Sequence, residues 1–297
     1  MTGKLGLALG SGAARGWSHI GVVRALVERG IRPQVITGCS IGSLVGAAYA
    51  SDQLDVLEDW VTGLTRMDVF GLLDARFRGG VFQGSRVMNA IGEQLKDRPI
   101  EQLDASFAAV ATDLITGREI WLREGNMLAA VRASCGLPGL FSPTRHEGRW
   151  LIDGGLVNPV PVSLCYAMGA ETVIAVNLNA HLANRRHLIE NKLIEIDKSD
   201  RELRGFEKLA DVFSSLFSSR DSEPGILDVV NASVSIMQER ITRSRMAGEP
   251  PLVEIAPRVD DVQLMDFHRA DETIAAGRAA VEEVSRKLEP LARQAAR

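Results

Sequence analysis

The chain has 297 residues, of which 45% are hydrophobic and 24% are charged. These values are typical of a soluble globular protein that buries a sizeable core. The formal net charge is −4 and the pI is about 5.8, which argues against nucleic acid as a partner because phosphate binding needs concentrated positive charge. Cys39, Cys135 and Cys165 form no CxxC pair and no complete disulfide framework, so we expect free thiols in a reducing compartment.

The sequence contains no recognisable targeting or membrane-spanning segment. Its first ten residues carry one basic residue and a short apolar run that glycines interrupt, which does not match a signal peptide. No segment approaches the roughly 20 apolar residues that span a bilayer. We therefore expect a cytoplasmic protein whose membrane contact, if it has any, is peripheral at the inner membrane.

Strands and helices alternate along the first part of the chain. Residues 4–9 are predicted as an apolar strand, and a helical pattern follows that stops at Gly30. Residues 33–37 form a second predicted strand, and 44–49 resume a helical pattern. This alternation favours an α/β fold with a largely parallel sheet.

The remaining elements continue in the same style. Residues 68–84 are predicted as a glycine-containing connection, and 267–292 as one long C-terminal helix. Three regions are predicted: a catalytic domain over 5–180, a polar excursion over 181–225 and a helical extension over 226–297 packed on the same domain. Other predicted helices cover 54–65, 85–95, 126–135, 160–168 and 226–246, and other predicted strands cover 107–112, 117–122, 150–153, 172–177 and 252–256.

The segment Gly38-Cys39-Ser40-Ile41-Gly42 matches the motif G-x-S-x-G between an apolar strand and an alanine-rich helix. In this motif the serine occupies a tight turn that exposes its hydroxyl above the sheet. The following helix directs its N–H groups and positive dipole end at the same place. Ser40 is therefore a candidate nucleophile, and a plain glycine-serine connection is the alternative. Cys39 is a rival nucleophile, but we expect its side chain to point inward as a small hydrophobe.

A glycine-rich loop, Gly10-Ser11-Gly12-Ala13-Ala14-Arg15-Gly16, follows the first strand and opens a helix. A dinucleotide site is disfavoured because the spacing of Gly10, Gly12 and Gly16 is one residue too long for G-x-G-x-x-G, and the second strand ends without a carboxylate. Two interpretations remain open. The loop either points backbone N–H groups at a developing oxyanion or is a purely structural turn.

Asp153 ends a predicted strand and is followed by Gly154 and Gly155. A carboxylate at the carboxyl end of a strand is well placed for chemistry in an α/β sheet, and an Asx-type turn is the alternative. For Asp153 to act as a base, its pKa must rise from about 3.9 toward the working pH, which partial desolvation would achieve.

No histidine has the sequence context of a triad member. A triad built on an elbow serine follows the order Ser, Asp, His. Downstream of Asp153, His181 and His187 lie in the polar excursion and His268 lies in the tail. His19 on the first helix and His146 in a predicted hairpin are expected to be surface or capping residues. A Ser–Asp dyad fits the sequence better.

Together, these blocks resemble the patatin-like phospholipase family, in particular the bacterial branch related to the catalytic domain of neuropathy target esterase. The likeness covers nearly the whole chain except about 181–225. The residues that carry it are the glycine loop through Gly21, the elbow 38–42, the block 132–138 through Pro143, Asp153-Gly-Gly155 and the tail stretches 245–251 and 266–270.

The resemblance implies a three-layer α/β/α sandwich with a central, mainly parallel sheet. It implies that Ser40 attacks an acyl ester while Asp153 takes its proton, without a metal or organic cofactor. The oxyanion hole would be the backbone of Ser11, Gly12 and Ala13, in a loop that Arg15 helps to fix and that Gly10 and Gly16 support. Many relatives carry glycine at the positions of Ser11 and Ala13, where the backbone N–H groups can still donate provided that the φ angles are negative.

The implied substrates are fatty-acyl esters of phospholipids, lysophospholipids or related lipids. Two other functions remain open: a non-catalytic regulator that binds a partner or acyl ligand on the same fold, and a thioesterase or transacylase that uses the same dyad. The oligomeric state is not predicted. Residues 208–219 contain an apolar helical face that either packs on the body or forms a lid that admits lipid, namely Leu209, Val212, Phe213, Leu216 and Phe217.

Overall fold

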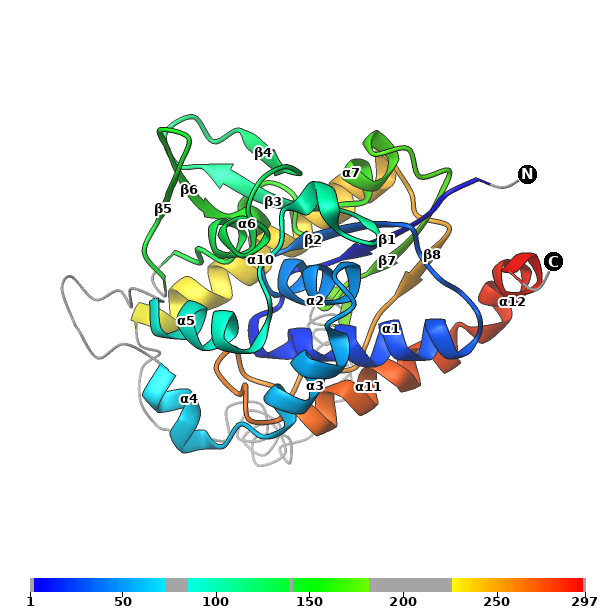
Figure 1. Cartoon of the computed structure of the whole chain (residues 1–297), viewed down its shortest axis with the longest axis horizontal. Helices are drawn as coiled ribbons and strands as arrows, with labels where there is room; N and C mark the ends of the chain where they lie inside the picture. The colour runs from blue at the N-terminus through cyan, green and yellow to red at the C-terminus, as the bar shows by residue number, and fades with distance from the viewer. Residues whose placement is uncertain (1–2, 73–84, 139–140, 182–225, 296–297) are drawn as a thin grey trace, which may run out of the picture.

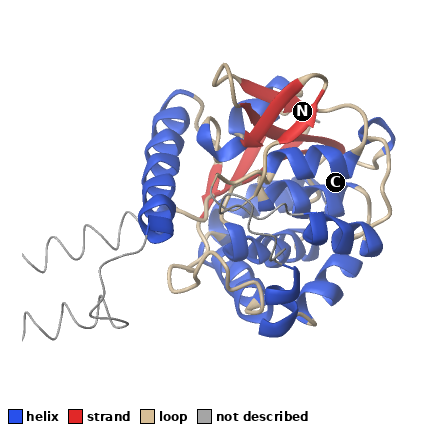
Figure 2. Ribbon diagram, turned by 90° about the vertical axis from the view of Figure 1, so that its left-hand side faces the viewer, coloured by secondary structure: helices blue, strands red, loops and turns tan. Residues whose placement is uncertain are grey.

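The computed structural model describes residues 3–72, 85–138, 141–181 and 226–295. Helices cover both faces of a central sheet (Figures 1 and 2). The predicted three-layer α/β/α arrangement with a mainly parallel sheet is therefore confirmed. Within the described ranges, no helix is both long and apolar enough to cross a membrane.

The sheet has eight strands, and hydrogen-bonded pairing runs in the order β5-β6-β3-β2-β1-β7-β8, with β4 also paired to β3. The pairs β1–β2, β1–β7, β2–β3 and β7–β8 are parallel, whereas β4, β5 and β6 pair antiparallel. The strands are β1 (Leu5–Leu9), β2 (Val35–Cys39), β3 (Ser106–Asp113), β4 (Glu119–Leu122), β5 (Thr144–His146), β6 (Arg149–Asp153), β7 (Thr172–Val176) and β8 (Val253–Ile255).

Most helices pack on one face of the sheet, where α1 and α2 lie against β1 and β2 and α11 covers α1. Helix α7 packs on the opposite face against β1, β2 and β7. The helices are α1 (Ser18–Glu28), α2 (Ile41–Ala50), α3 (Leu54–Thr62), α4 (Arg66–Leu72), α5 (Ser85–Gln94), α6 (Met127–Ser134), α7 (Val162–Ala167), α10 (Ile226–Gly248), α11 (Ala270–Glu283) and α12 (Ser285–Ala295), with short 3₁₀ turns η1 (Ala13–Trp17), η2 (Ile100–Gln102) and η3 (Gly154–Leu156).

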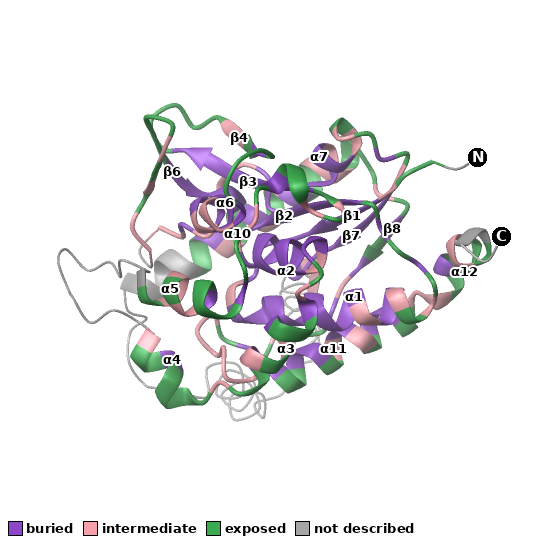
Figure 3. Cartoon of the chain, in the orientation of Figure 1, coloured by how far each residue is buried: buried purple, intermediate pink, exposed green. Residues whose placement is uncertain are grey.

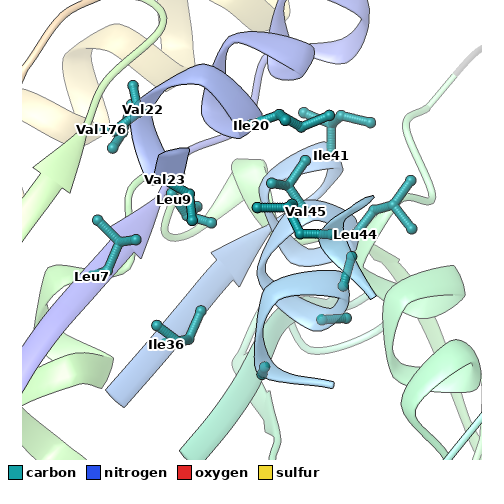
Figure 4. Packing of buried hydrophobic residues seen from close by; sticks show 14 of the residues in the cluster. Leu7, Leu9, Ile20, Val22, Val23, Ile36, Ile41, Leu44, Val45 and Val176 are labelled. Atoms are coloured by element: carbon teal, nitrogen blue, oxygen red, sulfur yellow. The ribbon is translucent and has the colours of Figure 1, made fainter. Parts of the chain in front are cut away.

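The core explains why the central strands β1 and β7 are mostly apolar. Leu7 and Leu9 of β1 face α1 and α2, whereas Ala8 between them faces α7, because successive side chains of a strand point to opposite faces. Both faces are covered, so the strands and α2 are buried (Figures 3 and 4). Each large aliphatic side chain that is fully buried in this way stabilises the fold by about 1.5–3 kcal/mol.

Helices α1 and α11 approach each other closely at two glycines. A Cβ atom on Gly21 would lie 1.9 Å from the carbonyl oxygen of Ile274, and one on Gly277 would lie 2.0 Å from that of Ser18. Side chains at either position would push the helices apart. Helix α1, held between the sheet and α11, is therefore buried along most of its length.

Two predictions of secondary structure are wrong. Residues 66–72 form α4, although the sequence suggested that a glycine-containing connection begins at 68. The C-terminal region forms α11 and α12 in place of one helix over 267–292, because Val284 leaves the helical conformation and its N–H donates to the carbonyl of Glu282. The amphipathic segment 208–219, His187 and all but the first residue of the excursion 181–225 lie outside the described residues.

Candidate active site

Ser40 occupies the tight turn between β2 and α2. Its backbone has φ 54° and ψ −125°, a left-handed conformation that costs free energy in a residue other than glycine. The turn has no room for side chains on its two glycines: a Cβ on Gly38 would lie 2.4 Å from the Cα of Ser43, and one on Gly42 would lie 2.3 Å from the carbonyl oxygen of Leu9. The backbone therefore has the strained strand-to-helix geometry of a nucleophile elbow.

The pairing of three strands explains how Ser40 meets a residue 113 positions away. Strand β3 pairs with three strands, and its residues that pair with β4 also pair with β2 or with β6. Since a strand has only two edges, β4 occupies one edge of β3, and β2 and β6 share the other. Along that shared edge, Cys39 of β2 lies opposite Val110 and Asp153 of β6 lies opposite Ala111. The ends of β2 and β6 thus meet head-on, and this brings Ser40 to Asp153.

The two candidate catalytic side chains are hydrogen-bonded. Ser40 Oγ donates to Asp153 Oδ2 at 2.7 Å, and the N–H of Gly155 donates to Asp153 Oδ1 at 2.8 Å. Asp153 is only 1% exposed. Burial raises the pKa of this carboxyl to about 6, although the hydrogen bonds from Ser40 and Gly155 oppose the rise. At neutral pH the carboxylate is therefore ionised and poised to accept a proton.

None of the described histidines hydrogen-bonds to Ser40 or Asp153. His181 contacts the carbonyl of Ala256 and His268 accepts from Arg66. The expectation that His19 is a surface or capping residue is wrong, because its ring is fully buried.

His19 instead holds the glycine loop. Its Nε2 lies 2.7 Å from the carbonyl oxygen of Gly10, and burial lowers its pKa to about 4. The ring is therefore neutral at pH 7. Since a carbonyl only accepts, Nε2 carries the proton, which leaves Nδ1 without a hydrogen-bond partner among the described residues.

Two serines that the sequence analysis did not identify fix the elbow. Ser134, at the end of α6, accepts from the backbone N–H of Ser40 at 2.8 Å and donates to the carbonyl of Val110 at 2.6 Å. Ser43 donates to the carbonyl of Ser40 at 2.6 Å. Together these bonds occupy both backbone polar groups of Ser40, so its peptide planes cannot rotate without breaking them.

The glycine loop lies beside the elbow, and its amides differ in availability. The N–H of Ser11 already donates to the carbonyl of Pro159 at 2.9 Å. Within the described part of the chain, the N–H groups of Gly12 and Ala13 have no acceptor. Arg15 is buried, and its Nε donates to the carbonyl of Gly12 at 3.2 Å. The condition of a negative φ is not met at Ala13, whose φ is 49°, a conformation that glycine adopts at lower cost.

Gln238 of α10 connects the loop with the rest of the site, and no sequence motif indicated it. Its Oε1 accepts from Ser11 Oγ at 2.9 Å and from Asn179 Nδ2 at 3.3 Å. Its Nε2 lies directly over Gly155, where a Cβ would be only 2.3 Å away. Gln238 thus contacts both the glycine loop, through Ser11, and Gly155, two residues after Asp153.

Ser40 lies where two pockets of different character meet. A pocket of about 870 Å³ is lined almost entirely by apolar side chains of α2, α3, α4 and α5 and the chain around Leu137. A smaller pocket of about 340 Å³ is lined by the glycine loop, Asp153 and Gln238. Ser40, Ala13 and Leu137 line both.

The thiols do not compete with Ser40. Cys39 is fully buried, as expected, and burial raises its pKa well above the usual range. Cys135 lines the apolar pocket, and burial raises its pKa to about 12. All three cysteines are free. Their thiols stay protonated at neutral pH, and a protonated thiol is a poor nucleophile.

Comparison with known proteins identifies the family of the chain. The family model described as "Patatin-like phospholipase" matches residues 7–166, a range that includes the glycine loop, Ser40 and Asp153. The chain belongs to the patatin-like phospholipase family. Its relatives include an uncharacterised NTE-family protein of Mycobacterium tuberculosis, 31% identical over 93% of this chain and 89% of the relative, so the chain falls in the NTE-type branch of the family. Membership supports a lipid hydrolase function.

More distant relatives share only part of their length with the chain. Patatin-like phospholipase domain-containing protein 6 of Homo sapiens is 34% identical over 61% of this chain and 14% of its own length. Among solved structures, VipD from Legionella pneumophila is 12% identical, with a TM-score of 0.44 over 98% of this chain and 77% of VipD.

Proposed function

We propose that the protein is a serine acyl hydrolase that cleaves fatty-acyl esters of phospholipids, lysophospholipids or related lipids through a Ser40–Asp153 dyad. The observation that carries this proposal is the position of Ser40. Its hydroxyl donates to a buried carboxylate at 2.7 Å and lies at the junction of the apolar and polar pockets. An ester with a long apolar acyl chain and a polar alcohol fits that junction.

The reaction proceeds in two halves. As Ser40 Oγ attacks the carbonyl carbon, its proton passes to Asp153 Oδ2, and an oxyanion forms on the carbonyl oxygen. The intermediate collapses, the ester C–O bond breaks, and protonated Asp153 returns the proton to the leaving alcohol. Asp153 then takes a proton from a water molecule as the water oxygen attacks the acyl-serine, and it returns that proton to Ser40 Oγ as the acyl–Oγ bond breaks and the fatty acid leaves. A carboxyl with a pKa of about 6 exchanges protons readily at neutral pH.

We assign the stabilisation of the oxyanion to the N–H groups of Gly12 and Ala13. In a trans peptide the N–H points opposite to the carbonyl of the preceding residue. Arg15 holds the carbonyl of Gly12 on its own side, which directs the N–H of Ala13 the other way. Ser11 is left out of the assignment because its N–H is bonded to Pro159. The N-terminus of α2 adds the positive end of the helix dipole.

The acyl chain is assigned to the apolar pocket. Leu44, Val87 and Ile91 contribute to its wall, so aliphatic carbon replaces water around the chain. The polar alcohol portion then faces the pocket that Gln238 and Arg15 line. A bulky substitution in the apolar pocket, such as Ile91→Trp, should lower kcat/KM for long acyl chains more than for short ones.

The proposal is tested by turnover of a soluble short-chain ester and of a lysophospholipid. Ser40→Ala and Asp153→Asn should each lower kcat/KM by about 10²–10⁴-fold or more, whereas His146→Gln, His181→Gln and His268→Gln should remain active. A histidine variant as inactive as Asp153→Asn would refute the dyad. Full activity of Ser40→Ala would refute the nucleophile.

The two remaining functions give different outcomes in the same assay. A transacylase would use the same dyad but would pass the acyl group to an added alcohol or lysolipid in preference to water, and a thioesterase would prefer acyl thioesters. A non-catalytic regulator would turn over none of these substrates.

A further inference from the structure

Helix α4 carries apolar side chains on opposite sides. Val69 and Leu72 line the apolar pocket beside Ser40. Met67 and Phe70, from the same two turns, are 79% and 72% exposed. In Figure 3, α4 lies at the outer edge of the molecule, away from the sheet, and is coloured mostly as exposed. Large apolar side chains on the water-facing side of a helix whose other apolar side is already buried indicate a surface that something apolar covers.

The exposure does not result from a frayed helix end. Thr65 and Asp68 form a reciprocal capping box: the N–H of Thr65 donates to Asp68 Oδ2 at 2.9 Å, and the N–H of Asp68 donates to Thr65 Oγ1 at 3.2 Å. Arg66 Nε also donates to His268 Nε2 at 3.0 Å, which ties the helix to the chain before α11. Met67 and Phe70 are thus presented on a helix that is fixed at its start.

The outer side of α4 continues into the substrate pocket. A surface groove of about 970 Å³ runs between α3 and α4, and Met67 lines it. Trp60, Leu64 and Leu72 line this groove and the apolar pocket alike. The groove on the exposed side of α4 and the pocket at Ser40 thus share a wall of three apolar side chains.

The charges at the groove indicate which kind of lipid surface the protein can bind. Asp59 and Asp68 line the groove, while Arg66 lies next to Met67 and Arg86 donates to the carbonyl of Gly71 in the groove wall. Two carboxylates therefore balance two guanidinium groups, so the surface has no excess of positive charge that would attract anionic lipids. Binding must then come from apolar burial, as for side chains that insert into the interfacial region of a membrane, with Trp60 suited to the boundary between apolar and polar layers.

We propose that Met67 and Phe70 of α4 dock the protein on a zwitterionic lipid bilayer, from which substrate enters the groove. This inference rests on the proposed function for the identity of the substrate, but the docking itself needs no turnover. Other occupants of the same surface would be a second copy of this chain or another protein.

The test measures binding and hydrolysis separately. Binding uses the full chain with Ser40→Ala, so that no lipid is consumed, and cosedimentation with phosphatidylcholine vesicles. Met67→Ser/Phe70→Ser should weaken binding at least tenfold, because two large apolar side chains no longer insert. The matched control, Ile115→Ser/Leu252→Ser, removes two exposed apolar side chains elsewhere and should bind as the parent does. Thermal unfolding of both double variants checks that the fold is intact.

Several outcomes would overturn the docking proposal. These are no binding of the parent to phosphatidylcholine, equal losses in the two double variants, or binding that strengthens sharply when phosphatidylserine is added. A dimer in light scattering that Met67→Ser/Phe70→Ser converts to monomer would assign the surface to a second copy. Turnover of a soluble ester by the protein with Ser40 intact tests the proposed function by itself, so the two proposals can fail independently.

Discussion

Replacing Asp153 with asparagine should stabilise the protein at neutral pH while abolishing its activity. Burial raises the pKa of Asp153 from 3.8 to about 6, so the folded state binds this proton more tightly than the unfolded state does. Stability is then highest below the unfolded pKa and is lost as pH rises through the folded pKa. The shift of about two pKa units corresponds to roughly 3 kcal/mol, of which about 1.4 kcal/mol falls between pH 5 and pH 8.

The assay is urea unfolding of the two proteins at pH 5, 6, 7 and 8. Other titrating groups cancel in the difference between the variant and the parent. We expect the difference in free energy of unfolding, Asp153→Asn minus parent, to increase by about 1.4 kcal/mol from pH 5 to pH 8. Asp113→Asn is the matched control. Backbone N–H bonds from Thr116 and Ile115 lower the pKa of Asp113 below its usual range, so this carboxyl is ionised in both the folded and the unfolded state above pH 5, and its difference from the parent should stay constant between pH 5 and pH 8. A pH-independent difference for Asp153→Asn would refute the buried, high-pKa carboxylate.

Three further predictions concern the same site. The kcat/KM of a soluble ester should rise tenfold per pH unit well below 6 and level off above it, because only ionised Asp153 accepts the serine proton; a profile flat from pH 5 to 8 would contradict this. Ser134→Ala leaves the buried N–H of Ser40 unpaired. It should lower the free energy of unfolding by about 1–3 kcal/mol, measured by urea unfolding, and should lower kcat, measured by steady-state kinetics. Unchanged values would show that water replaces the hydroxyl. Gln238→Ala removes the acceptor of Ser11 and Asn179 and should lower kcat/KM without moving the pH profile. Gln238→Glu adds a negative charge near Asp153 and should move the acid limb of the kcat/KM profile to higher pH. Identical profiles for Gln238→Glu and the parent would refute that proximity.

The elbow could be predicted because its signal is local. Gly38, Ser40 and Gly42 lie within five residues, and the requirement for glycine follows from contacts across one turn. The meeting of Ser40 with Asp153 is not local. It depends on β2 and β6 sharing one edge of β3, and an antiparallel strand inserted at the end of a parallel one leaves no periodic signature.

The errors and omissions have physical causes. His19 was expected at the surface because polar residues usually occupy the solvent side of a helix, but α1 lies between the sheet and α11, where Gly21 and Gly277 allow close packing. Ser134 and Gln238 are ordinary polar residues on helices. Ser134 lies in the block 132–138 that carries the family resemblance, but the role of each residue becomes visible only through its hydrogen bond, from Ser40 to Ser134 and from Ser11 to Gln238. The short helix α4 has only seven residues, too few to show the apolar periodicity by which helices are recognised in a sequence. Its start is fixed by the capping box of Thr65 and Asp68.

The most direct measurement of the central claim is labelling with a fluorophosphonate, which forms a covalent bond with an activated serine. We predict one adduct per chain, mapped by mass spectrometry to Ser40, and a labelling rate that falls steeply in Asp153→Asn. An unlabelled protein, an adduct on another residue, or unchanged labelling of Asp153→Asn would contradict the assignment of Ser40 and Asp153 as a catalytic dyad.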